Sequence, residues 1–229
     1  MNTMFWQEDT QQEDFIVPDN VVDLSFQIDC RGLLVDHAYP LSSAIQQALP
    51  WFGESRKDGL HLIHVAGSGN GWERPSDASA LLLPSRRTRL VLRLARDRVE
   101  NARALSGQML DIDGHALRVG EAKVLTLSTA ATLYARYIAA PADQEEVQFI
   151  TEMVQQMRTM GLDPKKVMAG KKRYFSTPGG ALCVRSLMVA DLPPADAIRL
   201  QEEGLGTQRT LGCGLFIEHK SINKVEQKQ

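Results

Sequence analysis

Near its carboxyl terminus the chain reads Gly204-Leu205-Gly206-Thr207-Gln208-Arg209-Thr210-Leu211-Gly212-Cys213-Gly214, with two G-x-G pairs. Glycine removes the side chain where a backbone must bend or approach another group closely. Because this stretch follows a predicted helix and runs into an apolar strand, its amides can face phosphate groups, with Arg209 adding positive charge. A turn that only reverses the chain is the alternative, but two pairs at this spacing favour phosphate binding.

The elements before this loop indicate the fold class. A strand is predicted over 132–138, a helix over 143–161, and two strands near 167–176 and 182–189. A short helix from Pro193-Pro194 to Gly204 and a last strand over 215–217 complete the order. The stripe expected to be buried on the first of these helices is Val147, Ile150, Val154 and Met157.

The first half of the chain repeats this order of elements. Val22, Leu24, Phe26 and Ile28 alternate along a strand over 21–29. A helix over 41–52, strands over 60–65 and 87–94, a helix from about 97 and a hairpin turning at Asp113-Gly114 follow. The pattern predicts an α+β fold of two tandem ferredoxin-like βαββαβ units. The expected boundaries are 1–20 for an acidic, flexible leader, 21–128 and 129–222 for the two units, 204–214 for the glycine-rich loop, and 223–229 for a tail.

The composition is that of a soluble globular protein. Of 229 residues, 43% are hydrophobic and 24% are charged, which argues against a disordered chain. No apolar run approaches the ~20 residues of a membrane span, and the first residues lack the basic and apolar regions of a secretory signal. Three widely spaced cysteines predict neither a disulfide framework nor a metal pair, so we expect a cytoplasmic protein with no membrane partner.

The charges are unevenly distributed, although the formal net charge is only −2. Residues 1–30 hold seven acids and no base, whereas residues 156–229 hold 12 bases and seven acids. A polyphosphate experiences the charge within a Debye length of ~8–10 Å. The basic carboxyl-terminal third can therefore bind a nucleic acid despite the negative total.

Together with the two-unit pattern, the glycine-rich loop resembles that of the RAMP superfamily of CRISPR-associated proteins. Further stretches resemble its precursor-crRNA endoribonuclease branch, and in particular the MYXAN-type subfamily of type I systems. These stretches are Val35-Asp36-His37-Ala38-Tyr39-Pro40-Leu41-Ser42-Ser43-Ala44, Ser68-Gly69-Asn70-Gly71-Trp72-Glu73-Arg74-Pro75, Ser85-Arg86-Arg87-Thr88-Arg89-Leu90 and Arg185-Ser186-Leu187-Met188-Val189-Ala190-Asp191-Leu192. The resemblance covers about residues 21–220.

The resemblance implies cleavage of CRISPR repeat RNA without a metal ion or another cofactor. The 2′-hydroxyl attacks the adjacent phosphate and leaves a 2′,3′-cyclic phosphate and a 5′-hydroxyl, while the protein holds the repeat stem-loop. The five histidines, at 37, 61, 64, 115 and 219, form no ligand cluster with acids or cysteines along the sequence. Other subunits of a type I effector complex are further possible partners.

His37 and Tyr39 are the catalytic candidates. An imidazole titrates near neutral pH, so His37 can take the 2′-proton or protonate the leaving oxygen. A surface histidine beside Asp36 is the alternative for His37. The Tyr39 hydroxyl can orient the nucleophile or the phosphate, or its ring can simply pack on the helix. The lysine that relatives often use has no clear equivalent, so the charge-stabilising group stays unassigned.

The RNA-binding candidates are basic side chains and the loop glycines. Arg86, Arg87 and Arg89, with Arg93, form a basic stripe opposite leucines, although such a stripe can also be a merely solvated face. The basic residues at 171–173, with Arg185, are expected to project from the second hairpin toward an A-form stem. The full set is Arg86, Arg87, Arg89, Lys171, Lys172, Arg173, Arg185, Gly204, Gly206, Arg209, Gly212, Gly214 and Lys220.

Two other functions fit the same pattern. A non-catalytic RAMP subunit that holds a guide RNA in an effector complex would use the same loop and basic hairpin, and only His37 separates it from the enzyme. A ferredoxin-like protein that binds small ligands is the third function, and it would not discriminate repeat RNA from unrelated RNA.

Overall fold

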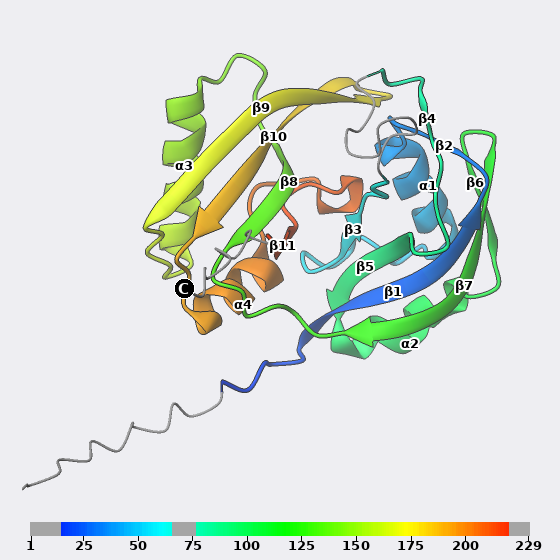
Figure 1. Ribbon diagram of the computed structural model, residues 1–229, viewed down its shortest axis with the longest axis horizontal. Helices are drawn as coiled ribbons and strands as arrows, with labels where there is room; N and C mark the ends of the chain where they lie inside the picture. Colours follow the sequence, from blue (N-terminus) through cyan, green and yellow to red (C-terminus); the bar gives the residue numbers. More distant parts are fainter. Residues whose placement is uncertain (1–14, 66–76, 220–229) are drawn as a thin grey trace, which may run out of the picture.

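The computed structural model describes residues 15–65 and 77–219 of the chain (Figure 1). Four predictions therefore lie partly or wholly outside the described residues: the leader over 1–20, the stretch Ser68–Pro75, Lys220 and the tail over 223–229. The first half contains β1 (Val21–Cys30), β2 (Leu33–Leu34), α1 (Ala38–Ala48), β3 (Gly59–His61), β4 (Leu81–Leu82), β5 (Arg89–Ala95), α2 (Val99–Ala102), β6 (Met109–Ile112) and β7 (His115–Leu125). The second half contains β8 (Leu133–Ala139), α3 (Glu146–Thr159), β9 (Lys166–Thr177), β10 (Gly180–Ala190), α4 (Pro194–Glu203), the 3₁₀ turn η3 (Arg209–Leu211) and β11 (Phe216–Glu218).

The first sheet has the strand order β3-β5-β1-β7-β6, and its neighbouring strands are antiparallel. β1 lies at the centre because its apolar residues alternate into the core, as predicted. Leu24 is fully buried and stands opposite Leu92 of β5 and Val124 of β7. The predicted hairpin is also confirmed, with Asp113 and Gly114 both at positive φ in the turn between β6 and β7.

The second sheet has the strand order β11-β8-β10-β9 and is also antiparallel. Helices α3 and α4 pack against one face of it, where their apolar residues share a core with β8, β10 and β11. A two-stranded pair, β2-β4, lies apart from both sheets. The predicted α+β class with antiparallel sheets is confirmed.

The predicted buried stripe of α3 is correct at Met157, only partly correct at Ile150 and Val154, which pack against the core without being fully buried, and wrong at Val147. The helix buries Phe149, Met153 and Met157, whereas Val147 is 76% exposed. The helix begins at a capping box of Glu145 and Gln148 rather than at residue 143. This start turns the large ring of Phe149 toward the sheet, and the residues four and eight positions later follow it on the same face.

The two halves are joined by a common core. Tyr137, Phe175, Val184 and Cys213 of the second half belong to the same buried cluster as β1 and α1. The predicted boundary near residue 128 falls in the connection between β7 and β8. Among the described residues, no helix combines the length and apolar character that crossing a membrane requires.

Candidate functional site

The glycine-rich loop connects α4 to β11 and is packed tightly into the seam between the two halves. Gly204, Gly206, Gly212 and Gly214 all have positive φ, which other residues adopt only with strain. A Cβ on Gly212 would lie 2.6 Å from the Leu62 side chain beyond β3, and one on Gly214 would meet the carbonyl oxygen of Leu205. These glycines are therefore required by close packing of the backbone.

The amides of the four glycines are committed to acceptors within the protein. Gly204 donates to the carbonyl oxygen of Leu200 at 2.9 Å, and Gly212 to that of Arg209 at 3.1 Å. Gly214 donates to the carbonyl oxygen of Tyr137 at 2.7 Å, and Gly206 donates to Gln156 Oε1 at 3.0 Å. In this structure the four amides therefore face acceptors of the protein itself, and their geometry does not support the predicted phosphate contacts. Their positions close the seam instead.

Arg209 also acts within the protein rather than toward solvent. Its guanidinium donates to the carbonyl oxygens of Glu203 at 2.8 Å, Glu202 at 3.3 Å and Lys57 at 3.3 Å. Burial and the nearby Arg93 charge lower the pKa of Arg209 to about 10, so it stays protonated at neutral pH. Its predicted phosphate contact is replaced by a link between α4 and the loop before β3.

A buried ion pair lies beneath this link. Arg93 of β5 is 1% exposed and donates to both carboxylate oxygens of Asp23, at 2.8 and 2.9 Å. It also donates to the carbonyl oxygens of Gln201 at 3.1 Å and Phe216 at 2.8 Å. The prediction that Arg93 belongs to a basic stripe available to RNA is therefore wrong, because this side chain joins the first sheet to α4 and β11.

Burial and the neighbouring charges set the pKa values of Asp23 and His61 beside Arg93. Burial alone would raise the pKa of Asp23, but the Arg93 guanidinium and His61 hold it well below its usual range. Burial lowers the pKa of His61, whose Nε2 lies 3.5 Å from the Asp23 carboxylate. Asp23 is thus ionised across the neutral range and balances Arg93.

Two more side chains that were predicted to contact RNA, Arg185 and Lys172, contact other groups of the protein in this structure. Arg185 is buried, with its guanidinium 5.7 Å from the centre of the Phe149 ring and 3.6 Å from the Glu146 carboxylate. Lys172 donates to the carbonyl oxygen of Ala142 at 2.6 Å. The prediction that Arg185 projects toward RNA is wrong, because its position on β10 faces α3.

The remaining predicted cations are exposed. Arg86 and Arg87 lie in the loop before β5, and Arg89 begins that strand and donates to the Arg86 carbonyl oxygen at 2.7 Å. Lys171 and Arg173 are exposed on β9, which is an edge strand of the second sheet. These five side chains are available to a polyanion in this structure.

His37 caps the start of α1 but lies in the interior. The ring is 1% exposed, with Nδ1 2.8 Å from the carbonyl oxygen of Leu34 and Nε2 accepting from the Ile63 amide at 3.1 Å. Both contacts agree with the tautomer that carries its proton on Nδ1. The alternative of a surface histidine is therefore excluded, and the ring joins α1 to the segment after β3.

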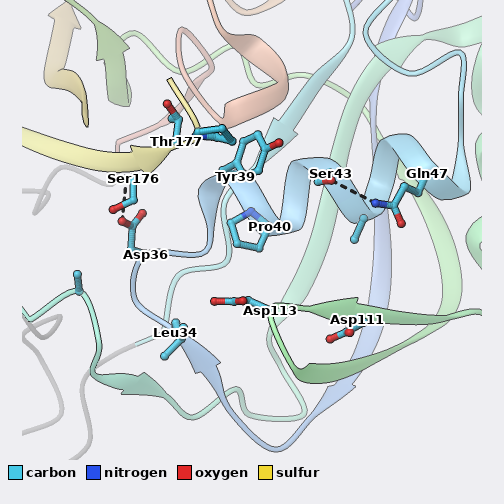
Figure 2. A pocket seen from close by; sticks show the side chains of 13 residues that line it. Leu34, Asp36, Tyr39, Pro40, Ser43, Gln47, Asp111, Asp113, Ser176 and Thr177 are labelled. Atoms are coloured by element: carbon cyan, nitrogen blue, oxygen red, sulfur yellow. Dashed lines mark hydrogen bonds between the residues drawn. The ribbon is translucent and has the colours of Figure 1, made fainter. Parts of the chain in front are cut away.

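Tyr39 lies in a different environment from His37. It is 40% exposed and lines a cavity of about 570 Å³ between α1, the β6–β7 hairpin and the end of β9. Figure 2 shows Tyr39 and Pro40 between Ser176 and the aspartates Asp111 and Asp113. Asp36 also lines this cavity, and none of the described lining residues is basic. The carboxylates give this cavity a negative charge that disfavours a phosphate. His37 does not line the cavity.

The seam also holds residues whose importance the sequence did not reveal. His64 stacks on Tyr137 with ring centres 5.7 Å apart, and its Nε2 lies 3.3 Å from the Tyr137 hydroxyl. Both line a small cavity of about 30 Å³ with Arg136 and His61. His64 and Tyr137 are 73 positions apart in the sequence. Their contact could have been predicted only from how the two halves pack together.

The potential metal ligands are dispersed, and the thiols are buried. Within residues 15–65 and 77–219, no three His, Cys, Asp or Glu side chains are grouped to hold a metal ion. Cys30, Cys183 and Cys213 are free and buried. Burial raises the pKa of Cys213 to about 12, so this thiol stays protonated and unreactive.

Comparison with known proteins relates the whole two-sheet body to one family. The family model described as Cas6 Crispr matches residues 22–221. The "CRISPR-associated endonuclease Cas6" of Myxococcus xanthus (strain DK1622) is 28% identical over 196 residues, which are 86% of this chain and 80% of that protein.

Solved structures with little sequence identity share the fold. "CRISPR associated protein Cas6" aligns with a TM-score of 0.58 at 12% identity, covering 87% of this chain and all of the other. "An RAMP protein binding different RNA substrates" aligns with a TM-score of 0.58 at 11% identity, covering 86% of this chain and 98% of the other. Because the family model covers nearly the entire described region, this chain belongs to the Cas6 family of CRISPR-associated proteins.

Proposed function

We propose that this protein is an endoribonuclease that binds the repeat stem-loop of precursor CRISPR RNA and cleaves it into guide RNAs. The observation that supports this most directly is the family match over residues 22–221, which spans both sheets and the glycine-rich seam. The relative named as a CRISPR-associated endonuclease, which aligns over 86% of this chain, supports the same activity.

The proposed reaction is an internal transesterification. The substrate 2′-oxygen forms a bond to the adjacent phosphorus as the bond to the 5′-oxygen breaks. A base takes the 2′-proton, and an acid supplies a proton to the 5′-oxygen. The products are a 2′,3′-cyclic phosphate and a 5′-hydroxyl, and we propose that no metal ion takes part.

The fold that carries this reaction is best described as two ferredoxin-like units. In each half a strand and helix are followed by two strands, a helix or helical turn and a last strand. The strand orders β3-β5-β1-β7 and β11-β8-β10-β9 support this assignment, with β6 added at the edge of the first. The units share a core, so we treat them as one folded body.

We propose His37 as the group that accepts the 2′-proton, after a local rearrangement. The Nδ1 contact with Leu34 leaves the lone pair on Nε2, and the Ile63 amide occupies that lone pair. Releasing this bond leaves the buried Ile63 amide without an acceptor, which costs about 1–3 kcal/mol and would have to be supplied by RNA binding. Tyr39 is given no role in the reaction, because the acidic cavity that it lines disfavours the scissile phosphate.

The exposed cations are proposed to hold the RNA. Arg86, Arg87 and Arg89 lie on one surface loop and strand, and Lys171 and Arg173 lie on the edge strand β9. Contacts of this kind read the phosphates and A-form shape of a stem. We further propose a cytoplasmic location, in keeping with three free thiols, and association with other subunits of a type I effector complex.

The burial of His37 favours a second candidate function. If the ring stays bonded to Leu34 and Ile63 when RNA is bound, it cannot exchange a proton with the substrate. The protein would then be a non-catalytic subunit that holds the guide RNA. This candidate predicts tight RNA binding without cleavage.

One experiment separates the two candidates. Purified protein is incubated in EDTA with a CRISPR repeat RNA of its source organism, and the product ends are identified. His37→Gln keeps an acceptor for the Ile63 amide but has no group that titrates near neutral pH, and thermal unfolding checks that it folds. We expect cleavage by the wild type and binding without cleavage by His37→Gln. Full activity of His37→Gln would remove His37 from the mechanism.

A further inference from the structure

A row of large side chains crosses the second sheet on the face turned away from α3 and α4. Tyr134 of β8 stands opposite Ile217 of β11 and Met188 of β10, and Met188 stands opposite Met168 of β9. The row therefore spans all four strands in register. Neighbouring strands lie ~4.8 Å apart, so the row is about 14 Å wide, which is enough for a nucleobase to lie flat on it.

This face is open to solvent, whereas the opposite face is covered. Leu133, Ala135 and Leu187 alternate with the row and are fully buried in the core that the sheet shares with α3 and α4. Met168 is 61% exposed, and Tyr134 is half-buried. A cavity of about 640 Å³ lies over the row.

The side chains around this cavity suit an RNA base and its phosphate. His219 meets the Tyr134 ring edge to face, with ring centres 5.9 Å apart and an angle of 70° between the planes. Arg136, two positions after Tyr134 on the same face, is exposed and lines the cavity. The one acidic residue among the described lining residues, Glu218, accepts a hydrogen bond from Ser128 Oγ at 3.1 Å.

Gly170 of β9 leaves space beside the row. A Cβ at this position would meet the hydroxyl of Ser186 on β10, so a larger residue would require that side chain to turn away. Arg136 and Ile217 line the smaller cavity with His61 and His64 as well. The row of large side chains therefore continues to the seam between the two halves.

We propose that this face, defined by Tyr134, Arg136, Met168, Met188 and His219, binds an unpaired segment of the RNA. One base stacks on Tyr134 against the methionine side chains, and Arg136 contacts the neighbouring phosphate. Stacking on aromatic side chains is tolerant of sequence and suits single strands, whereas a stem presents no free base faces. The inference rests on the proposed function and adds a site separate from the exposed cations of β9 and the β5 loop.

The test compares Tyr134→Leu with Tyr134→Phe in the full-length protein. Loss of one stacked base weakens binding of a short oligouridylate by about tenfold, equivalent to ~1.4 kcal/mol. Tyr134→Phe keeps the ring and should bind like the wild type. Tyr174→Leu is the matched control, because Tyr174 is 55% exposed on the same sheet but does not line the cavity.

A second measurement uses only the wild type, so it tests the inference even if Tyr134→Leu does not fold. Photocrosslinking of 5-iodouridine RNA to the wild type, followed by mass spectrometry, should identify the peptide that contains Tyr134. Crosslinks confined to other peptides, or equal oligouridylate affinities for wild type and Tyr134→Leu, would overturn the inference.

The outcomes also separate this inference from the proposed function. Normal cleavage of hairpin RNA by a Tyr134→Leu variant with weakened oligouridylate binding supports both. If Tyr134→Leu cleaves hairpin RNA and binds oligouridylate as the wild type does, the inferred base-binding face alone is overturned. A wild type that neither binds nor cleaves repeat RNA overturns the proposed function. If Tyr134→Leu abolishes association with another subunit and leaves RNA binding unchanged, the face is a protein-docking surface instead.

Discussion

Replacing Arg93 by methionine removes the buried cation that joins the two halves while keeping most of the side-chain volume. The change leaves the Asp23 carboxylate without its bidentate partner and removes the donor to the carbonyl oxygens of Gln201 and Phe216. Removing one member of a buried ion pair typically costs about 3–5 kcal/mol. Because the Asp23 side chain is 16% exposed, we expect a decrease in stability near ~3 kcal/mol, the lower end of that range.

The free energy of unfolding is measured by urea denaturation, with circular dichroism and tryptophan fluorescence as two independent probes. Arg96→Met is the control, because the Arg96 side chain is about half exposed and its Nε lies 3.9 Å from the Asp19 carboxylate. An exposed pair of this kind contributes no more than about 1 kcal/mol. A decrease below ~1 kcal/mol for Arg93→Met, or weakened RNA binding in a fully stable variant, would refute the assignment of Arg93 to the seam.

Three further predictions follow from the same structure. Gly212→Ala should destabilise the protein by about 1–3 kcal/mol more than Gly107→Ala, because both have similar positive φ but only Gly212 is crowded; equal effects on thermal or urea unfolding would contradict this. The lowered pKa of Asp23 contributes stability that is complete above its unfolded pKa of ~3.9 and declines as pH falls further. The difference in unfolding free energy between the wild type and Asp23→Asn should therefore be constant near neutrality and shrink below about pH 4. Replacing Lys171 and Arg173 by glutamine should reduce the slope of log affinity against log salt by ~0.7–0.9 for each phosphate that the variant no longer neutralises, and an unchanged slope would exclude these side chains as phosphate ligands.

Local patterns in the sequence were sufficient to predict the strands of the two large sheets and their order along the chain, but not the short pair β2-β4. Alternating residues such as Leu24 and Leu92 identify strands because burial follows a period of two. Helix α3 was placed correctly but rotated incorrectly, since a stripe of Val147 and Ile150 looks as apolar as one of Phe149 and Met153. Which stripe is buried depends on the sheet beneath it, and that packing is not a local property.

The expected exposure of candidate side chains was wrong where a charged residue has a partner far along the chain. Arg93 reaches Gln201 and Phe216, and Arg209 reaches Lys57, across the seam. Sequence spacing gives no sign of such contacts, so these cations looked available to RNA. The position of His37 at the start of α1 was predicted correctly, but the burial of its ring was not, because the Ile63 amide that binds the ring belongs to another element. The exposed cations on β9 and before β5 needed no distant partner, and their exposure was predicted correctly.

The central claim is that this Cas6-family chain cuts repeat RNA through its own side chains, and the RNA ends report on it directly. Wild-type protein in EDTA should convert a repeat RNA into a fragment ending in a 2′,3′-cyclic phosphate and one beginning with a 5′-hydroxyl. His37→Gln, folded and binding with similar affinity, should leave the RNA intact. Intact RNA with the wild type under the same tight binding would contradict the claim and identify the protein as an RNA-holding subunit.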